Sequence, residues 1–213
     1  MEQLIILSKG DSAARNAVLG GLRGLIKDGG DEAGLSWLVL VAGELGREGA
    51  LTILPAVHYE EEGDILCEAV SATLKRRAGD ALHEILREVH LSQRADARTI
   101  LYEALDGAVV GADEPTRERL RLFAMERCEI EKRENPPELI HEPLMLLHYA
   151  GGKDVLARVK EARASCRRGD LLDRNLNDVD AVVRGEDFLE GTRQMLAWSW
   201  RDVAENLGKL FDL

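Results

Sequence analysis

The sequence predicts an all-α protein built from stacked pairs of helices, and three observations lead to this fold class. The first is that two stretches, residues 37–54 and 65–86, read almost alike: each has an apolar helix, a break containing glycine and a second apolar helix. Self-similarity at a period of about 20–50 residues is typical of stacked supersecondary units. The second is composition, because aromatic residues are only 4% of the chain while Leu, Ala, Glu and Arg are abundant, which favours helices over strands.

The third observation is a leucine near the end of the first helix of each pair. It recurs at intervals of 29, 31 and 42 residues, as Leu45, Leu74, Leu105 and Leu147. The longest interval contains residues 106–113, which we interpret as a lengthening of one helix or of its turn before Pro115. Such insertions are tolerated where they leave a stack at a loop. About four helical pairs are therefore predicted, within a single domain that spans residues 1–213.

The amino-terminal part, residues 1–32, is expected to cap the stack with a helix from about Ser12 to Lys27. This helix contains Gly20, Gly21 and Gly24, and each glycine costs about 1 kcal/mol relative to alanine in a helix interior. We interpret these glycines as positions where the helix comes into close contact with another helix.

The helical pairs occupy residues 33–163. Their apolar positions fall three and four apart, which gives each helix one buried stripe. Helix boundaries are marked by Gly46 and Gly79 between paired helices, and by Asp113 as a capping residue ahead of Pro115. Pro143 predicts a kink or a late helix start. The second helices of the pairs are predicted at Glu48–Tyr59, Gly79–Val89, Thr116–Glu131 and Lys153–Arg163.

The carboxyl-terminal part, residues 164–213, is predicted to hold a polar, loop-like connector and a capping helix. The connector runs from Ser165 to Asp180 and the helix from about Glu186 to Phe211. Trp198 and Trp200 are two residues apart on that helix and hence on different faces, so at least one is a candidate partner contact. Packing in the core is the favoured alternative for both.

Net charge and cysteine usage limit the class of protein. The formal net charge of −11 disfavours a nucleic-acid partner, because binding phosphates needs clustered Lys and Arg. The tight basic runs 75–77 and 167–168 are interpreted as solvated helix ends. Cys67, Cys128 and Cys166 are widely spaced and odd in number, as expected for reduced thiols inside a cell.

Membrane insertion and secretion are not expected. The longest dense apolar run, Leu35–Ala42, is far shorter than the roughly 20 residues that span a bilayer. The short apolar run Leu4–Leu7 follows Glu2 rather than a basic cluster, so no secretory signal is predicted. We therefore expect a cytoplasmic protein.

The run Gly49–Val57, followed by Asp64–Leu74, resembles the rhythm of HEAT-like repeat proteins. The resemblance covers residues 33–163 and lies in the periodicity, while the regular Arg near the start of each first helix is missing. It implies a right-handed α–α superhelix of the HEAT or armadillo type, in which the second helices line the concave face. It says little about activity, because one fold supports many functions.

On that face, the residues expected to meet a partner carry mixed charge: Glu84, Arg87, Glu88, Arg117, Arg121, Lys160 and Arg163. Patches of both signs suit a protein partner better than a polyanion. The predicted function is accordingly a non-catalytic scaffold or adaptor that binds a protein, with no cofactor and with an oligomeric state that the sequence leaves open.

Two alternatives of other classes remain open. The dipeptides His83-Glu84 and His141-Glu142 resemble the iron ligands of deoxyhypusine hydroxylase, a HEAT-like enzyme that uses four such pairs. Only two pairs are present, and one is predicted on a second helix and the other on a first helix, so they should not face each other. A HEAT-like DNA glycosylase is less favoured still, because it would need a basic concave face.

Overall fold

The computed structural model describes residues 1–29, 31–59, 64–134, 137–164, 166–167 and 169–210. Every regular element in these residues is a helix, which confirms the predicted all-α class. The chain divides into two compact units, one formed by Met1–Ala108 with Arg193–Leu213 and the other by Val109–Thr192. Two helices, α7 (Ala95–Val109) and α12 (Glu190–Leu196), lie at the boundaries between these segments.

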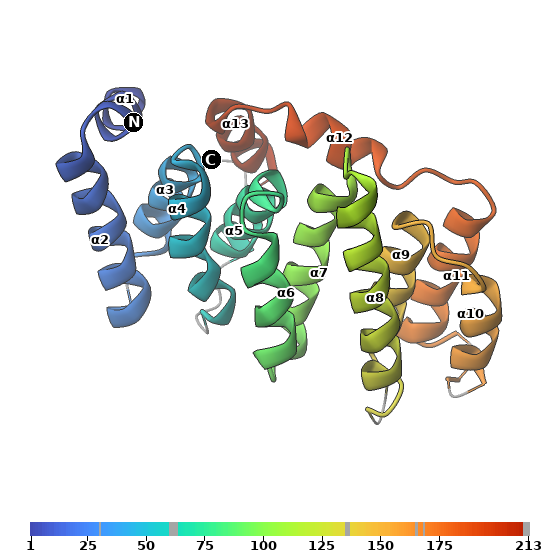
Figure 1. Ribbon diagram of the computed structural model, residues 1–213. Coiled ribbons are helices and arrows are strands. Elements are labelled where there is room, and N and C mark those ends of the chain that lie inside the picture. The colour runs from blue at the N-terminus through green and yellow to red at the C-terminus, as the bar shows by residue number, and fades with distance from the viewer. Residues whose placement is uncertain (30, 60–63, 135–136, 165, 168, 211–213) are drawn as a thin grey trace. The chain divides into compact units, whose positions relative to one another are not determined.

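The first unit contains seven further α-helices and a short 3-10 helix in its described residues. They are α1 (Glu2–Gly10), α2 (Ser12–Asp28), α3 (Glu32–Gly43), α4 (Gly46–Ile53), η1 (Leu54–His58), α5 (Asp64–Arg77), α6 (Leu82–Leu91) and α13 (Trp200–Leu210). Figure 1 shows α4 and α6 in one layer and α3 and α5 in another. The predicted second helices Glu48–Tyr59 and Gly79–Val89 thus correspond to α4 with η1 and to α6.

Helix α5 contacts both α3 and α7 at a nearly constant sequence separation. Leu66 N donates to Glu32 Oε1 over 3.2 Å, a separation of 34 residues. Ser71 Oγ donates to Glu103 Oε2 over 2.7 Å, a separation of 32 residues. Further along the same helices, Arg77 Nε donates to the carbonyl of Gly43, 34 residues away, and Gly107 lies against Lys75, 32 residues away. Because each helix pair keeps nearly the same separation at two points, the paired helices run in the same direction, and α3, α5 and α7 are parallel.

Glycines allow close backbone approach at two points of the first unit. A Cβ on Gly49 would lie 1.7 Å from the carbonyl oxygen of Ala42, where α4 follows α3, and a Cβ on Gly107 would lie 1.9 Å from that of Lys75. The close contact expected at Gly20, Gly21 and Gly24 is not made, because a Cβ added at any of them would meet no described atom within 4 Å. That expectation was wrong: these glycines lie on the outer side of α2.

The second unit contains α8 (Glu114–Glu131), α9 (His141–Tyr149), α10 (Val155–Arg163) and α11 (Leu171–Val183). Helix α9 packs against the other three. As predicted, Asp113 caps α8, accepting a hydrogen bond of 2.9 Å from Thr116 N, and Pro115 stands in the first turn. Pro143 lies in the first turn of α9, which agrees with the late start. The predicted second helices Thr116–Glu131 and Lys153–Arg163 correspond to α8 and α10.

The carboxyl-terminal prediction was wrong in two places. The expected connector from Ser165 to Asp180 is mostly helix α11, because the side chain of Asp170 accepts a hydrogen bond from Asp173 N and an apolar stripe is buried along the helix. The stripe consists of Leu172, Leu176, Val179 and Val182.

The expected single helix Glu186–Phe211 is instead α12 and α13. The Asp202 carboxylate accepts hydrogen bonds from the backbone N and the hydroxyl of Ser199, both 2.7 Å long, and so fixes a new helix start. Helix α13 packs on α3 and α5. Phe211 lies outside the described residues.

Candidate binding surface

Helix α6 presents the first three predicted contact residues because Ile85, Leu86 and Val89 bury its other face. Glu84 accepts a hydrogen bond of 2.5 Å from Arg47 Nη2 on α4. Partial burial opposes ionisation of Glu84, but a backbone hydrogen bond and Arg47 together hold the pKa of this carboxyl below its ordinary value. Glu84 is therefore an ionised carboxylate that already has a cation.

Glu88 has a partner as well, whereas Arg87 is open to solvent. The Nε2 atom of His58 lies 2.8 Å from Glu88 Oε1. Within the described residues, Arg87 is exposed and forms no ion pair. Of the three predicted contacts on α6, only Arg87 presents a charge that a partner could take without displacing another side chain.

On α8, the two predicted cations bond within their own unit. Arg121 donates to Glu114 Oε1 over 2.6 Å, to Glu118 Oε2 through Nε over 2.9 Å, and to the carbonyl of Ala150 over 3.0 Å. Arg117 Nε donates to the carbonyl of Ala112 over 3.1 Å. Arg121 thus joins α8 to the end of α9, so its guanidinium stabilises the packing of these two helices.

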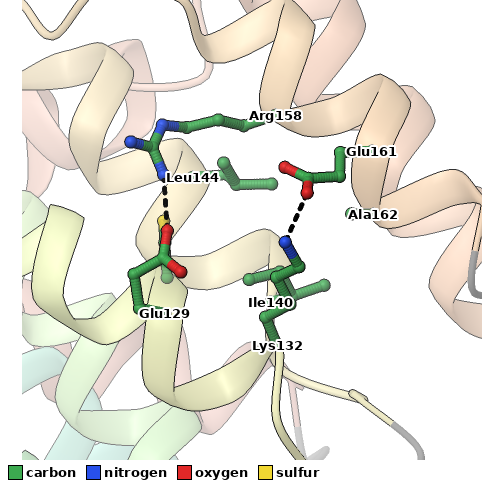
Figure 2. Close-up of a pocket in the computed structure, with 8 residues that line it drawn as sticks. Glu129, Lys132, Ile140, Leu144, Arg158, Glu161 and Ala162 are labelled. Atoms are coloured by element: carbon green, nitrogen blue, oxygen red, sulfur yellow. Dashed lines mark hydrogen bonds and ion pairs between the residues drawn. The ribbon is translucent and has the colours of Figure 1, made fainter.

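Ion pairs join α8 to α10 and fix their relative direction. Arg158 Nη1 lies 3.2 Å from Glu129 Oε1, and Lys132 bonds Glu161; each pair is 29 residues apart. The equal separation means that α8 and α10 run parallel. These residues, together with Cys128, Ile140, Leu144 and Ala162, line a small pocket, and Figure 2 shows the two ion pairs between lining residues.

The pocket does not supply a reactive thiol. Burial raises the pKa of Cys128 to about 12, so the thiol is protonated near neutral pH. The nucleophile in cysteine chemistry is the thiolate, which needs a lowered pKa. The pocket is therefore a packed junction between helices, stabilised by ion pairs at its edge.

A second concavity lies between α10 and α11 and contains two of the predicted contact residues. It is a groove lined by Leu156, Val159, Lys160, Arg163, Asn177, Asp180 and Arg184. Arg163 lies 3.4 Å from Asp173, and Arg184 lies 2.7 Å from Asp180. Lys160 forms no ion pair with any described residue. The groove therefore brings together cations from two helices.

Trp198 and Trp200 lie in different surroundings. Trp200 begins α13 and packs partly buried against the core residues Ile5, Val18 and Val41. The guanidinium carbon of Arg201 lies 5.5 Å from the centre of its ring. Trp198 is half-buried in the break before α13, so the two residues do not share a helix as predicted. Core packing was the favoured interpretation, and Trp200 agrees with it.

The two His-Glu dipeptides lie on different units, His83-Glu84 on α6 and His141-Glu142 on α9. His141 has contacts through both ring nitrogens: Nδ1 lies 3.1 Å from the carbonyl of Glu138, and Nε2 lies 3.1 Å from Asn175 Nδ2. Its Nε2 is also 3.3 Å from Glu142. The described residues contain no group of three or more His, Cys, Asp or Glu side chains arranged to hold a metal ion.

The basic run 75–77 is not the solvated helix end that was predicted. It ends α5, but the Arg76 side chain is only 5% exposed and lies 2.8 Å from Glu44. Arg77 Nε donates to the carbonyl of Gly43 over 2.5 Å. These arginines are tertiary contacts between α5 and the end of α3. Residue Arg168 of the other basic run lies outside the described residues.

Sequence reasoning missed a set of exposed apolar side chains on α8 and α10 of the second unit. Leu122 and Met125 on α8 are 59% and 44% exposed, and Leu156 on α10 is 41% exposed. Leu122 and Met125 are three residues apart and so share one face of the helix. The signal was present in the sequence: both fall outside the stripe of buried positions Leu120, Phe123, Ala124, Arg127 and Cys128.

No helix among the described residues combines the length and the apolar character needed to cross a bilayer.

No protein-family model, curated protein or solved structure matches the chain. A function for the chain therefore has to be argued from its own residues.

Proposed function

We propose that the chain is a HEAT-like, non-catalytic scaffold or adaptor that binds a protein partner through its second helices. The observation that carries the proposal is the exposure of Leu122, Met125 and Leu156 on α8 and α10. Leu122 and Met125 share one face of α8, and exposed apolar side chains that lie together mark sites of protein interaction more than isolated ones do. Their neighbours are charged residues of both signs, and such a mixture favours specific protein partners.

The ion pairs between α8 and α10 support the same proposal. They join the two helices along one side, so the exposed residues on them are held in a fixed arrangement. A surface that is already ordered loses less conformational entropy on binding than a flexible one. A binding face built on such helices suits the recognition of a folded partner or of an extended segment.

The experiment that tests the proposal places a photo-crosslinking amino acid, benzoylphenylalanine, at one exposed position at a time. The test positions are Leu122 and Leu156. The matched control is Leu171, which is 66% exposed but lies on α11, outside the second helices. Crosslinking is carried out in cells of the organism from which the chain comes, and the adducts are identified by mass spectrometry.

We expect one and the same protein at Leu122 and Leu156 and not at Leu171. The purified partner should then bind the Leu122→Glu variant at least about tenfold more weakly, because a hot-spot contact is worth about 2 kcal/mol or more. Crosslinks at Leu171 alone, or no protein adduct at any of the three positions, would refute the proposal.

A further inference from the structure

We propose that the groove between α10 and α11 binds an acidic peptide segment of the protein partner, with the apolar side chains of that segment covering Leu156. This inference rests on the proposed function and names the chemistry of the partner. The groove is lined by Lys160, Arg163 and Arg184. The whole chain carries a formal net charge of −11, so this surface is cationic on an otherwise acidic molecule.

The cations that face the groove outnumber its carboxylates, so the groove can accept further carboxylates from a ligand. Its three cations are accompanied by two carboxylates, Asp180 in the lining and Asp173 beside Arg163. Lys160, on the rim, has no ion-pair partner among the described residues. An ammonium group offers three hydrogen-bond donors that can pair with an incoming carboxylate.

Arg184 also keeps donors free for a ligand. Asp180 accepts from Nε over 2.7 Å and from Nη2 over 3.3 Å, which uses one edge of the guanidinium. The side chain is 68% exposed, so this pair is weak and its remaining N–H groups face water. A planar guanidinium can bind a second carboxylate through its other edge. Arg184 can therefore contact a peptide without releasing Asp180.

The apolar part of the groove favours a peptide over a polyphosphate. Leu156 is 41% exposed, and the buried Val159 also lines the groove. A nucleic-acid backbone is charged at every phosphate and has no aliphatic side chain to cover Leu156. An acidic segment that carries leucine or a similar residue can pair with the cations of the groove and also cover Leu156. Asn177 adds an amide that can pair with the peptide backbone.

The flanks of α10 separate this groove from the junction with α8. Arg158 and Glu161 point to α8, as their ion pairs show, whereas Lys160 and Arg163 line the α11 side. Substituting Lys160 therefore leaves the ion pairs between α8 and α10 intact. This makes Lys160 the residue of choice for a test that does not disturb the fold.

The test measures fluorescence anisotropy of a labelled peptide in which four Asp and Glu residues surround two leucines. Four comparison peptides have the same length. Three of them replace the Asp and Glu residues, by Asn and Gln, by Lys or by phosphoserine, and the fourth replaces the leucines by Ser. A single-stranded DNA is the fifth comparison probe. The variants are Lys160→Glu and Lys160→Gln. The control is Lys27→Glu, the same charge change at an exposed position on α2 of the first unit.

We expect the acidic leucine peptide to bind in preference to every comparison probe. Lys160→Glu should weaken binding about tenfold and Lys160→Gln about threefold, because reversal replaces an attraction by a repulsion. Lys27→Glu should change it less than twofold, and circular dichroism should show all variants folded. Raising the salt concentration should weaken binding of the wild-type protein.

The inference is overturned if the acidic peptide does not bind at concentrations up to about 1 mM. It is also overturned if Lys27→Glu weakens binding as much as Lys160→Glu, or if the DNA or the phosphopeptide binds more tightly than the acidic peptide. The crosslinking experiment at Leu122 separates the two proposals. A partner captured there whose affinity is unchanged by Lys160→Glu removes this inference alone, whereas no captured partner removes the proposed function as well.

Discussion

We predict that Glu44→Gln destabilises the first unit by about 2–4 kcal/mol. Glu44 follows α3 and faces three cations: Arg76 Nη2 at 2.8 Å, Lys9 Nζ at 3.3 Å and Arg77 Nη2 at 3.9 Å. The side chains of Glu44 and Arg76 are 12% and 5% exposed. Glutamine keeps the size of the side chain but removes the negative charge that these cations surround.

The magnitude follows from the burial of Arg76. Its Nε and Nη1 atoms have no hydrogen-bond partner among the described residues, and Glu44 accepts the hydrogen bond that Nη2 donates. Removing one partner of a buried ion pair costs about 3–5 kcal/mol. We place the cost somewhat lower, at about 2–4 kcal/mol, because Glu44 is partly exposed and glutamine still accepts one hydrogen bond.

The pH dependence of this stabilisation has a definite sign. Burial acts to raise the pKa of Glu44, but Arg76 and then Lys9, through hydrogen bonds and charge, hold it below the ordinary value of 4.5. A carboxyl whose pKa is lower in the folded state stabilises that state above its unfolded pKa. The contribution of Glu44 is therefore full at neutral pH and is lost as the pH falls through its folded pKa. The difference between wild type and Glu44→Gln should shrink below about pH 4.5.

The assay is urea unfolding followed by far-ultraviolet circular dichroism, with hydrogen exchange of peptides from α3 and α5 to locate the effect. Glu48→Gln is the matched control, because Glu48 makes an ion pair of 3.5 Å with Arg15 but is 62% exposed. Exposed pairs contribute about 0–1 kcal/mol, so this variant should unfold almost as wild type does. Equal stability losses for the two variants, or a loss for Glu44→Gln that does not shrink in acid, would contradict the reasoning.

Three further outcomes are expected. Gly21→Ala should stabilise the protein by about 0.5–1 kcal/mol, since an added Cβ meets no described atom, whereas Gly49→Ala should lower the melting temperature because its Cβ would collide with a backbone carbonyl. In the native protein, Ellman's reagent should modify the exposed Cys67 and leave the buried Cys128 unmodified until urea is added; equal rates would contradict the burial of Cys128. Asp170→Ala should cost about 0.5–2 kcal/mol and increase hydrogen exchange at the start of α11, because it removes the capping side chain; unchanged exchange there would refute that role.

Helices with strong local signals could be predicted from the sequence alone. The spacing of apolar residues located α4, α6, α8 and α10 to within a few residues, and Asp113 ahead of Pro115 marked the start of α8. These features succeed because capping and amphipathic spacing act over one or two turns. They require no knowledge of which helices pack together.

The carboxyl-terminal helices could not be predicted in the same way, for two physical reasons. In α11, charged residues are so frequent that the segment reads as a loop, although Leu172, Leu176 and Val179 form a regular buried stripe. Between α12 and α13, the break depends on hydrogen bonds that the Asp202 carboxylate accepts from Ser199, the residue before α13, whereas the hydrophobic pattern continues across the break. Average polarity was thus a poorer guide than the spacing of a few apolar residues.

The binding surface was the least predictable part, because the availability of a charge depends on tertiary neighbours. Glu84 bonds Arg47, a residue 37 positions away, and Arg121 bonds the carbonyl of Ala150, 29 positions away. Helices that run parallel place residues about one helical pair apart beside each other, and no local pattern tells which charges meet in this way.

This distinction changes what substitutions on the surface should do. A cation such as Arg121, in which all three side-chain nitrogens hold intramolecular partners, gains little from a ligand, because a new contact competes with the old ones. Arg121→Ala should therefore reduce stability more than binding. Lys160→Glu should do the reverse, since Lys160 pairs with no described residue. Measuring both quantities for both variants separates a cation that holds the fold from one that is available to a partner.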